Sequence, residues 1–399
     1  MPASENSSTT EIAKMVNDRV DELLAQYPPT STGKVEFLGG QYDAGLAWVH
    51  FPEGYGGLGL SPSHQPMINN RLAAAKAPSA WARNPIGYGM GAPTVVAHGS
   101  EAQKQRYLRP LFTGQEVWCQ MFSEPGAGSD VAGLSARAEK DGDEWIVNGQ
   151  KVWTTLAHLA RWGMLVVRTD PDQPKHRGLT YFVVDMDQEG VEVRPLRQMT
   201  GEAEFNEVYL TDARIADAER MGDVGDGWRV SLTTLMNERV AIGGTVPPRG
   251  SGTIQVAVNT WDSTGGDAAA RDELMKLWIR AESLRLTNIR ASQQRKTGTP
   301  GPEGSVGKLA SAELNKDILN FNLNLMGPAA MLYGDYTMEQ PATAMGASPP
   351  QKAFLRSRAN SIEGGTTEVM KNIIGERVLG LPGDVRTDKD LPWGDVPRN

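Results

Sequence analysis

The chain has 399 residues, of which 39% are hydrophobic and 22% charged, and its formal net charge at pH 7 is −8. This length predicts about two to three domains and a core large enough for a buried small-molecule site. The acidic balance argues against nucleic acid as the main partner. No apolar run reaches the roughly 18 residues of a membrane span. The first residues lack the basic start and apolar stretch of a secretory signal, so we expect a cytoplasmic protein.

The chain contains one cysteine and five histidines. A single cysteine forbids a disulfide within the chain and fits a reducing compartment. Cys119 lies in the apolar run 117–122, where packing in the core is favoured over a role as nucleophile. The histidines show no metal-ligand spacing, and we expect no metal site.

Residues up to about 115 have the pattern of helices broken by glycine-rich loops. Ser100 is a suitable cap for a helix over 100–111. A period of two then begins, and closely spaced β-rich runs continue to about residue 213 without intervening helices. The turn Asp141-Gly142-Asp143 indicates a hairpin between two of them. This middle block predicts a barrel or sandwich and not a doubly wound sheet.

Helical periodicity returns at Gly227 and covers about 227–246, 268–296, 304–333 and 366–380. The predicted class is therefore α+β, in the order helices, strands, helices. We expect an N-terminal helical domain at 1–117, a middle β-domain at 118–226 and a C-terminal helical domain at 227–399.

The most specific string is FSEPGAGSD, at residues 122–130. A strand end runs there into a glycine-rich turn whose backbone N–H groups can cradle a pyrophosphate, and Ser129 adds a donor. A glycine pair alone is more often an ordinary surface turn. About twenty residues later the chain reads NGQKVWTT, at 148–155. Trp153 can stack on an aromatic ring while Thr155 binds the edge of that ring, although a lone tryptophan is more often a core residue.

Together these strings closely resemble the acyl-CoA dehydrogenase family, and the resemblance extends from about residue 52 through the last helix. It implies an N-terminal helical domain, a middle β-barrel and a C-terminal four-helix bundle. It also implies an FAD enzyme of lipid metabolism and fatty acid β-oxidation, which converts an acyl-CoA to the 2-enoyl-CoA and passes electrons to an electron-transfer flavoprotein. A tetramer, built as a dimer of dimers, is typical of the family.

The resemblance also implies flavin contacts. Backbone and hydroxyl groups of the first string face the ring or the pyrophosphate, the second string flanks the isoalloxazine, and a late glycine loop approaches with a helix start. The residues are Phe122, Ser123, Gly128, Ser129, Trp153 and Thr155 in the β-domain, and Gly364, Gly365, Thr366 and Glu368 in the late segment.

Removal of an α-proton from a thioester requires a carboxylate in a dry pocket, with a raised pKa. Glu238 and Arg239 are the only charged residues between positions 230 and 248. Their helix is apolar nearly all round and is expected to be buried. A structural ion pair to another helix is the alternative, since such pairs also bury charge. The stripe that indicates burial is Trp228, Leu232, Leu235 and Ile242.

Glu363 is the second candidate base, because many family members carry their base in this loop, directly before a Gly-Thr pair. Here that position is Gly364, and Glu363 lies one residue earlier. A capping or solvated carboxylate is the competing interpretation. The branched-chain and long-chain members place the base in a Glu-Arg pair on the helix, which Glu238-Arg239 matches. We therefore favour Glu238 as the base, with Arg239 tuning the pocket and a bulky or branched acyl group as substrate.

Two segments depart from the family pattern. An Arg-x-x-Phe-Gly stretch that crosses the dimer interface is replaced by NTWDSTGG at 259–266, and a later glycine pair becomes Gly327-Pro328. Proline removes an N–H donor there. The sequence is therefore compatible with both a homo-oligomer and a hetero-oligomer. The alternatives to a stand-alone dehydrogenase are a flavin-poor partner subunit of a heterotetramer and an oxygen-using acyl-CoA oxidase on the same fold.

Overall fold

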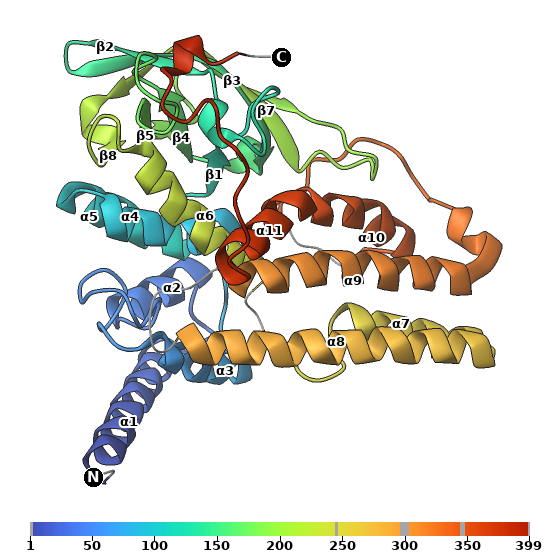
Figure 1. Cartoon of the computed structure of the whole chain (residues 1–399). Coiled ribbons are helices and arrows are strands. Elements are labelled where there is room, and N and C mark those ends of the chain that lie inside the picture. The colour runs from blue at the N-terminus through green and yellow to red at the C-terminus, as the bar shows by residue number, and fades with distance from the viewer. Residues whose placement is uncertain (1–2, 244–245, 296–302, 344–347, 398–399) are drawn as a thin grey trace.

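The computed structural model describes residues 3–243, 246–295, 303–343 and 348–397 (Figure 1). The elements follow the order helices, strands, helices, so the predicted architecture is confirmed. In Figure 1 the sheet lies at the top, the N-terminal helices lie below it, and the long C-terminal helices extend to one side. The predicted domain boundaries stay predictions, although β1 begins at Trp118 and α6 at Gly227.

The N-terminal part is helical, as predicted. Ser100 caps α5 in a capping box: its hydroxyl accepts from the Gln103 N–H at 3.2 Å, and the Gln103 side chain accepts from the Ser100 N–H at 2.9 Å. Both donors would otherwise be unpaired at the helix start. The helices are α1 (Ala3–Gln26), α2 (Lys34–Asp43), α3 (Gln65–Ala74), α4 (Ala92–His98) and α5 (Glu101–Thr113).

The middle part forms one eight-stranded sheet in the order β6-β7-β3-β2-β4-β5-β8, with β1 pairing parallel to β4. All of the β-rich runs form strands. The predicted hairpin joins β2 and β3, where Asp141 pairs with Glu144 and Gly142 adopts a φ of 62°. The strands are β1 (Trp118–Met121), β2 (Arg137–Asp141), β3 (Glu144–Thr155), β4 (Trp162–Arg168), β5 (Leu179–Asp185), β6 (Val191–Pro195), β7 (Phe205–Ala216) and β8 (Arg220–Met221).

Both faces of the central strands are buried. Every residue of β4 is buried: Met164 joins the core shared with the N-terminal helices, and Leu165 joins a second core on the opposite face. Successive side chains of a strand point to opposite faces, so β4 is the centre of two cores. Cys119 is fully buried in the second one, which confirms its assignment to packing, and burial raises the pKa of its thiol.

The C-terminal part is helical. α7, α8 and α9 share a core that includes Ile254, Leu277 and Phe321. The sequence patterns do not indicate α7 or α10, and the helix expected over 304–333 ends earlier, because Gly327 has a φ of 58° and Pro328 follows. The helices are α6 (Gly227–Gly243), α7 (Thr253–Thr264), α8 (Ala268–Arg295), α9 (Glu303–Met326), α10 (Pro350–Ser357) and α11 (Thr367–Ile373). Within the described ranges, no helix is long and apolar enough to cross a membrane.

Candidate active site

The string FSEPGAGSD leaves β1 and forms an open turn. Phe122 is buried and packs edge-on against Tyr181, with ring centroids 5.8 Å apart. The backbone carbonyl of Ser123 accepts from the Val152 N–H at 2.9 Å. Gly128 and Ser129 are exposed, and a Cβ added at Gly128 would have no atom within 4 Å. The start of the string is therefore fixed, and its glycine-rich end is accessible.

A buried ion pair fastens the two strings together. The ammonium of Lys151 lies 2.8 Å from a carboxylate oxygen of Glu124, and their side chains are 0% and 8% exposed. Lys151 also donates to the carbonyl of Phe122 at 3.1 Å. The Glu124 carboxylate accepts from the N–H groups of Ser135 and Ala136 at 2.6 and 2.9 Å. Burial lowers the pKa of Lys151, and Glu124 opposes that shift.

Neither partner of this pair is among the predicted site residues, although both lie in the two strings. The signal available in the sequence is that each of the two strings carries one residue of opposite charge, Glu124 in the first and Lys151 in the second. Buried charges are retained when they are paired.

Trp153 lies on a bulge in β3. Its φ is +59°, and the pairing of β3 with β7 shifts register between Lys151 and Thr154. The ring is 57% exposed and meets Phe205 edge-on, at a centroid distance of 5.8 Å. A left-handed conformation is costly for an aromatic residue, and such strain concentrates at functional sites. The bulge turns a large ring outward beside Thr155, which is half-buried and pairs with Phe205.

Glu238 lies on α6 and faces β1. Its carboxylate accepts from the side-chain amide of Gln120 at 3.4 Å, and the contact is partly buried. Gln120 is two residues before Phe122, so the favoured base lies next to the first string. Arg239 is within α6, but its side chain lies outside the described residues.

The expectation that α6 is apolar and buried all round is wrong. Leu232 and Met236 are 40% and 41% exposed. The buried face instead carries hydroxyls: Thr234 lies 2.9 Å from Thr94 and 3.1 Å from the Tyr181 hydroxyl. These hydroxyls satisfy one another across the contact with α4 and β5, so a polar face can be buried without loss of hydrogen bonds. Glu238 is consequently half-buried and not enclosed.

Glu363 is held by other side chains. Arg356 binds it in a bidentate ion pair, with nitrogen–oxygen distances of 3.1 and 2.9 Å. The side-chain amide of Asn360 donates to it at 3.0 Å. Both carboxylate oxygens are therefore already engaged, and a bidentate guanidinium pair of this kind is strong and directional.

Lys308 lies within electrostatic reach of both candidate bases. It projects from α9, is 3% exposed, and donates to the carbonyls of Asn360, at 2.9 Å, and Gly365. Burial lowers its pKa, and the nearby charges of Glu363 and then Glu238 oppose the shift. One ammonium therefore interacts with both carboxylates, which places the late loop and α6 at the same site.

The late loop turns sharply before α11. Gly364 and Gly365 have φ values of 63° and 96°, and a Cβ at Gly365 would lie 2.4 Å from the Met370 side chain. Thr366 caps α11 by accepting from the Val369 N–H at 3.1 Å. A cleft of about 630 Å³ adjoins this turn. Its lining residues are Leu309, Glu313, Lys316, Ser361, Ile362, Thr367, Glu368 and Lys371.

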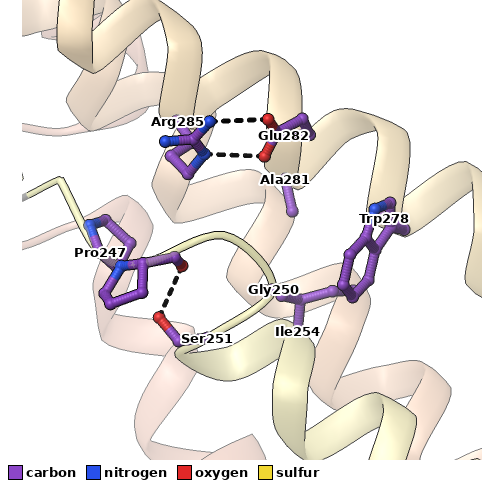
Figure 2. A pocket seen from close by; sticks show the side chains of 9 residues that line it. Pro247, Gly250, Ser251, Ile254, Trp278, Ala281, Glu282 and Arg285 are labelled. Atoms are coloured by element: carbon purple, nitrogen blue, oxygen red, sulfur yellow. Dashed lines mark hydrogen bonds and ion pairs between the residues drawn. The ribbon is translucent and has the colours of Figure 1, made fainter.

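A second pocket lies between the start of α7 and the middle of α8 (Figure 2). Its volume is about 30 Å³, which suits about one water molecule. Glu282 and Arg285 pair with each other at its rim. This pocket is too small for a cofactor. Among the residues described, none form a cluster that could hold a metal ion.

The structure brings most of the predicted residues to one region. β1, β3, α6 and the loop before α11 each contribute, and the two segments that depart from the family pattern lie elsewhere. NTWDSTGG covers the end of α7, which stops at Gly265 in a left-handed cap. Gly327-Pro328 opens a short 3₁₀ turn after α9, where Met331 and Leu332 are 81% and 75% exposed.

The order of helical, β-sheet and helical parts is that of a three-domain enzyme family. Three family models match: "Acyl-CoA dehydrogenase, N-terminal domain" at residues 5–115, "Acyl-CoA dehydrogenase, middle domain" at 119–213 and "Acyl-CoA dehydrogenase, C-terminal domain" at 225–379. The chain belongs to the acyl-CoA dehydrogenase family.

Two curated relatives come from Mycobacterium tuberculosis. "Acyl-CoA dehydrogenase IpdE1" is 37% identical over 347 residues, which cover 86% of each chain. "Acyl-CoA dehydrogenase FadE34" is 38% identical over 85% of this chain and 45% of its own length, so this chain spans less than half of FadE34. The solved ChsE4-ChsE5 complex from Mycobacterium tuberculosis has a TM-score of 0.69 and 26% identity, with 96% of this chain and 99% of that chain covered.

Proposed function

We propose that this chain catalyses the FAD-dependent α,β-dehydrogenation of an acyl-CoA thioester to the 2-enoyl-CoA. One observation carries the proposal: Glu238 contacts Gln120 on the strand that leads directly into FSEPGAGSD. A half-buried carboxylate therefore lies next to the string that resembles the flavin-binding element. A base beside a hydride acceptor is what this reaction requires.

The residues fit FAD. The Trp153 ring is turned outward by a strained bulge and is 57% exposed, which suits stacking against an isoalloxazine. The neighbouring Thr154 hydroxyl is buried and makes no hydrogen bond within the described part of the chain. Gly126 and Gly128 leave open space at the turn, so a pyrophosphate can approach their backbone. FAD, when bound, supplies the acceptor for the hydride that leaves the β-carbon.

The roles proposed for the side chains follow from their contacts. Glu238 takes the α-proton of the thioester. The backbone N–H at or near Gly364 donates to the thioester oxygen and stabilises the charge that develops there. Glu363 is held in its ion pair with Arg356 and does not take the proton.

A bulky or branched acyl group is the proposed substrate, because the base lies on a helix in a Glu-Arg pair, as in the branched-chain and long-chain members of the family. Electron-transfer flavoprotein is the proposed electron acceptor. We also place the enzyme in the cytoplasm, where a chain whose single cysteine is buried as a free thiol needs no oxidising environment.

A mixed oligomer is the second proposal. The two altered segments, 259–266 and 326–329, would contact a neighbouring subunit if the chain assembles as family members do. Met331 and Leu332 beside the second segment are largely exposed, as expected of a surface that a partner covers. The chain matches less than half the length of FadE34, which leaves room in that relative for a second chain of this size. In such a complex this chain carries the base, and its partner completes the FAD contacts.

The visible spectrum of the purified chain, alone and with added FAD, tests cofactor binding. Anaerobic addition of a panel of acyl-CoA thioesters, including branched and ring-bearing ones, then tests chemistry through bleaching of the flavin band. Glu238→Gln should hold FAD and abolish bleaching, whereas Glu363→Gln should bleach to the extent that it still holds FAD. Loss of bleaching in Glu363→Gln with FAD retained, and not in Glu238→Gln, would move the base to the loop. Absence of any flavin band would refute the hypothesis of a stand-alone enzyme and would favour a partner subunit of a mixed oligomer.

The same preparation separates a dehydrogenase from an oxidase. Under air, a dehydrogenase bleached by substrate stays reduced until an artificial acceptor is added. An oxidase regains its band with oxygen alone and produces hydrogen peroxide.

A further inference from the structure

Arg356 of α10 contacts two different domains. Its Nε donates to Glu204 at 2.9 Å, in the loop that precedes β7. Its two terminal nitrogens bind Glu363 in the loop before α11. The Glu204 and Glu363 side chains are 7% and 30% exposed. A planar guanidinium can form these three directed hydrogen bonds at once, whereas a lysine ammonium cannot match the bidentate geometry.

The Glu204 end of this network reaches the Trp153 bulge. The Arg356 guanidinium lies over the Phe205 ring, 5.4 Å from its centroid, and Phe205 supports Trp153 edge-on. The backbone carbonyl of Glu204 accepts from the Leu156 N–H at 2.8 Å. Residues on both sides of Trp153 and Thr155 are therefore tied to the segment that Arg356 holds.

The Glu363 end of the network reaches the glycine turn. Glu363 directly precedes Gly364 and Gly365, and Asn360 donates to the same carboxylate at 3.0 Å. Lys308 donates to the carbonyls of Asn360 and Gly365. The turn is thus anchored to α9 by Lys308 and to the β-domain by Arg356.

We propose that Arg356 is a positioning residue that sets the Trp153 bulge and the Gly364-Gly365 turn in a fixed relation to each other. The proposal rests on the proposed function in one respect, namely that these two elements flank a flavin. The mechanical coupling between them is a property of the chain without cofactor. Glu363 has the same explanation: it is the acceptor that connects the turn to Arg356.

The charges of the network support this assignment. Burial raises the pKa of Glu204, and the guanidinium of Arg356 opposes that shift. Without Arg356, Glu204 and Glu363 would both lose the guanidinium that binds them. Removal of a partner from a buried charged group costs more than the hydrogen bonds alone, because the remaining charge is left desolvated.

Hydrogen exchange of the chain without flavin tests the coupling. In Arg356→Met we expect amide exchange to accelerate by about tenfold or more, both in peptides covering 153–156 and in those covering 360–366. Exchange in β4, at 162–168, should stay unchanged and reports that the sheet is intact. The matched control is Arg358→Met, two residues later. Arg358 stacks on Phe354 and donates to Ser357, so exchange at 153–156 should not change.

Acceleration confined to 350–366 would overturn the proposal, because Arg356 would then support only its own helix. Arg356→Lys keeps the charge without the fork, and both segments should show a smaller acceleration than in Arg356→Met. If Arg356→Met loses protection in β4 as well, only Arg356→Lys tests the coupling. Exchange in Arg356→Lys that equals that of the parent chain in both segments would then refute the proposal.

A second readout connects the coupling to the cofactor. FAD retained through a desalting column should fall in Arg356→Met and recover partly in Arg356→Lys. If the parent chain holds no FAD while the exchange result is obtained, the proposed function fails and the coupling stands. If FAD is held equally well by all three chains, Arg356 has no positioning role toward the flavin.

Discussion

Replacement of Lys151 by methionine removes the cation of the buried pair that joins the two strings. The ammonium is fully buried, 2.8 Å from Glu124 and 3.1 Å from the Phe122 carbonyl. Methionine has a similar length and flexibility, so the change deletes charge and hydrogen bonds and leaves little cavity. Glu124 is left buried with only the backbone N–H groups of Ser135 and Ala136 as partners.

Loss of one partner from a buried ion pair costs about 3–5 kcal/mol. The two remaining N–H donors still stabilise Glu124, so we expect the lower end, about 3 kcal/mol. The free energy of unfolding of a whole protein is about 5–15 kcal/mol, so a loss of this size should clearly lower the urea concentration at the unfolding midpoint. Lys151→Met with Glu124→Gln should cost less than the sum of the two single changes, because the second change removes the charge that the first leaves unpaired.

Urea unfolding followed by circular dichroism measures this cost. The control is Lys276→Met on α8. This lysine pairs with Asp272, but the two side chains are 71% and 68% exposed. That substitution should leave the unfolding midpoint almost unchanged, because surface pairs contribute little. Equal midpoints for Lys151→Met and Lys276→Met would show that the Lys151 pair does not hold the strings together.

Three further predictions concern single groups. Trp153→Gly should change the free energy of unfolding by no more than about 1 kcal/mol, because relief of the strained φ of +59° offsets the extra conformational entropy that glycine loses on folding. FAD retention on a desalting column should fall. A large loss of stability would contradict the strain argument. Asp217 has its pKa lowered to about 2, chiefly by hydrogen bonds from Arg220 and Trp145. Its stabilisation is present above the unfolded value of 3.8 and disappears as pH falls toward 2. Asp217→Asn lacks this stabilisation, so its acid transition should begin at higher pH than that of the parent chain, and an unchanged onset would contradict the argument. Cys119 should resist a thiol reagent in native buffer and react fully in denaturant, because burial raises the pKa of its thiol; rapid labelling of the native chain would contradict its place in the core.

The β-domain could be predicted well because its signals are local. Alternation of apolar residues, a hairpin turn around Gly142 and two compact strings all lie within short stretches of sequence. The capping box at Ser100 is equally local and is formed as expected. Such features need no knowledge of what packs against them, and the order helices, strands, helices follows from them directly.

The environment of α6 could not be predicted in the same way. Its apolar composition indicates burial, but Leu232 and Met236 are exposed while Ser231 and Thr234 are buried. The Ser231 hydroxyl donates to the Gly227 carbonyl of its own helix, whereas the Thr234 hydroxyl finds partners on α4 and β5, more than fifty residues away in sequence. A hydrophobic pattern counts side chains on one helix, whereas burial depends on which surfaces meet that helix.

The choice between the two carboxylates shows the same dependence on distant partners. Sequence position alone makes Glu363 a plausible base, since it lies one residue from the usual place in the loop. In the structure Arg356 and Asn360 occupy both of its oxygens. To accept a substrate proton, Glu363 would first have to give up at least one hydrogen bond to a charged group, which costs about 1.5–3 kcal/mol.

Glu238 has different neighbours. Its carboxylate accepts from the neutral side-chain amide of Gln120 at 3.4 Å, and the ammonium of Lys308 lies within electrostatic reach of it. A long hydrogen bond to an amide is easily displaced by substrate, whereas a bidentate guanidinium pair is not. Glu238 on the helix therefore stays the proposed base and Glu363 in the loop the proposed anchor, and the bleaching of Glu238→Gln and Glu363→Gln tests that division of roles.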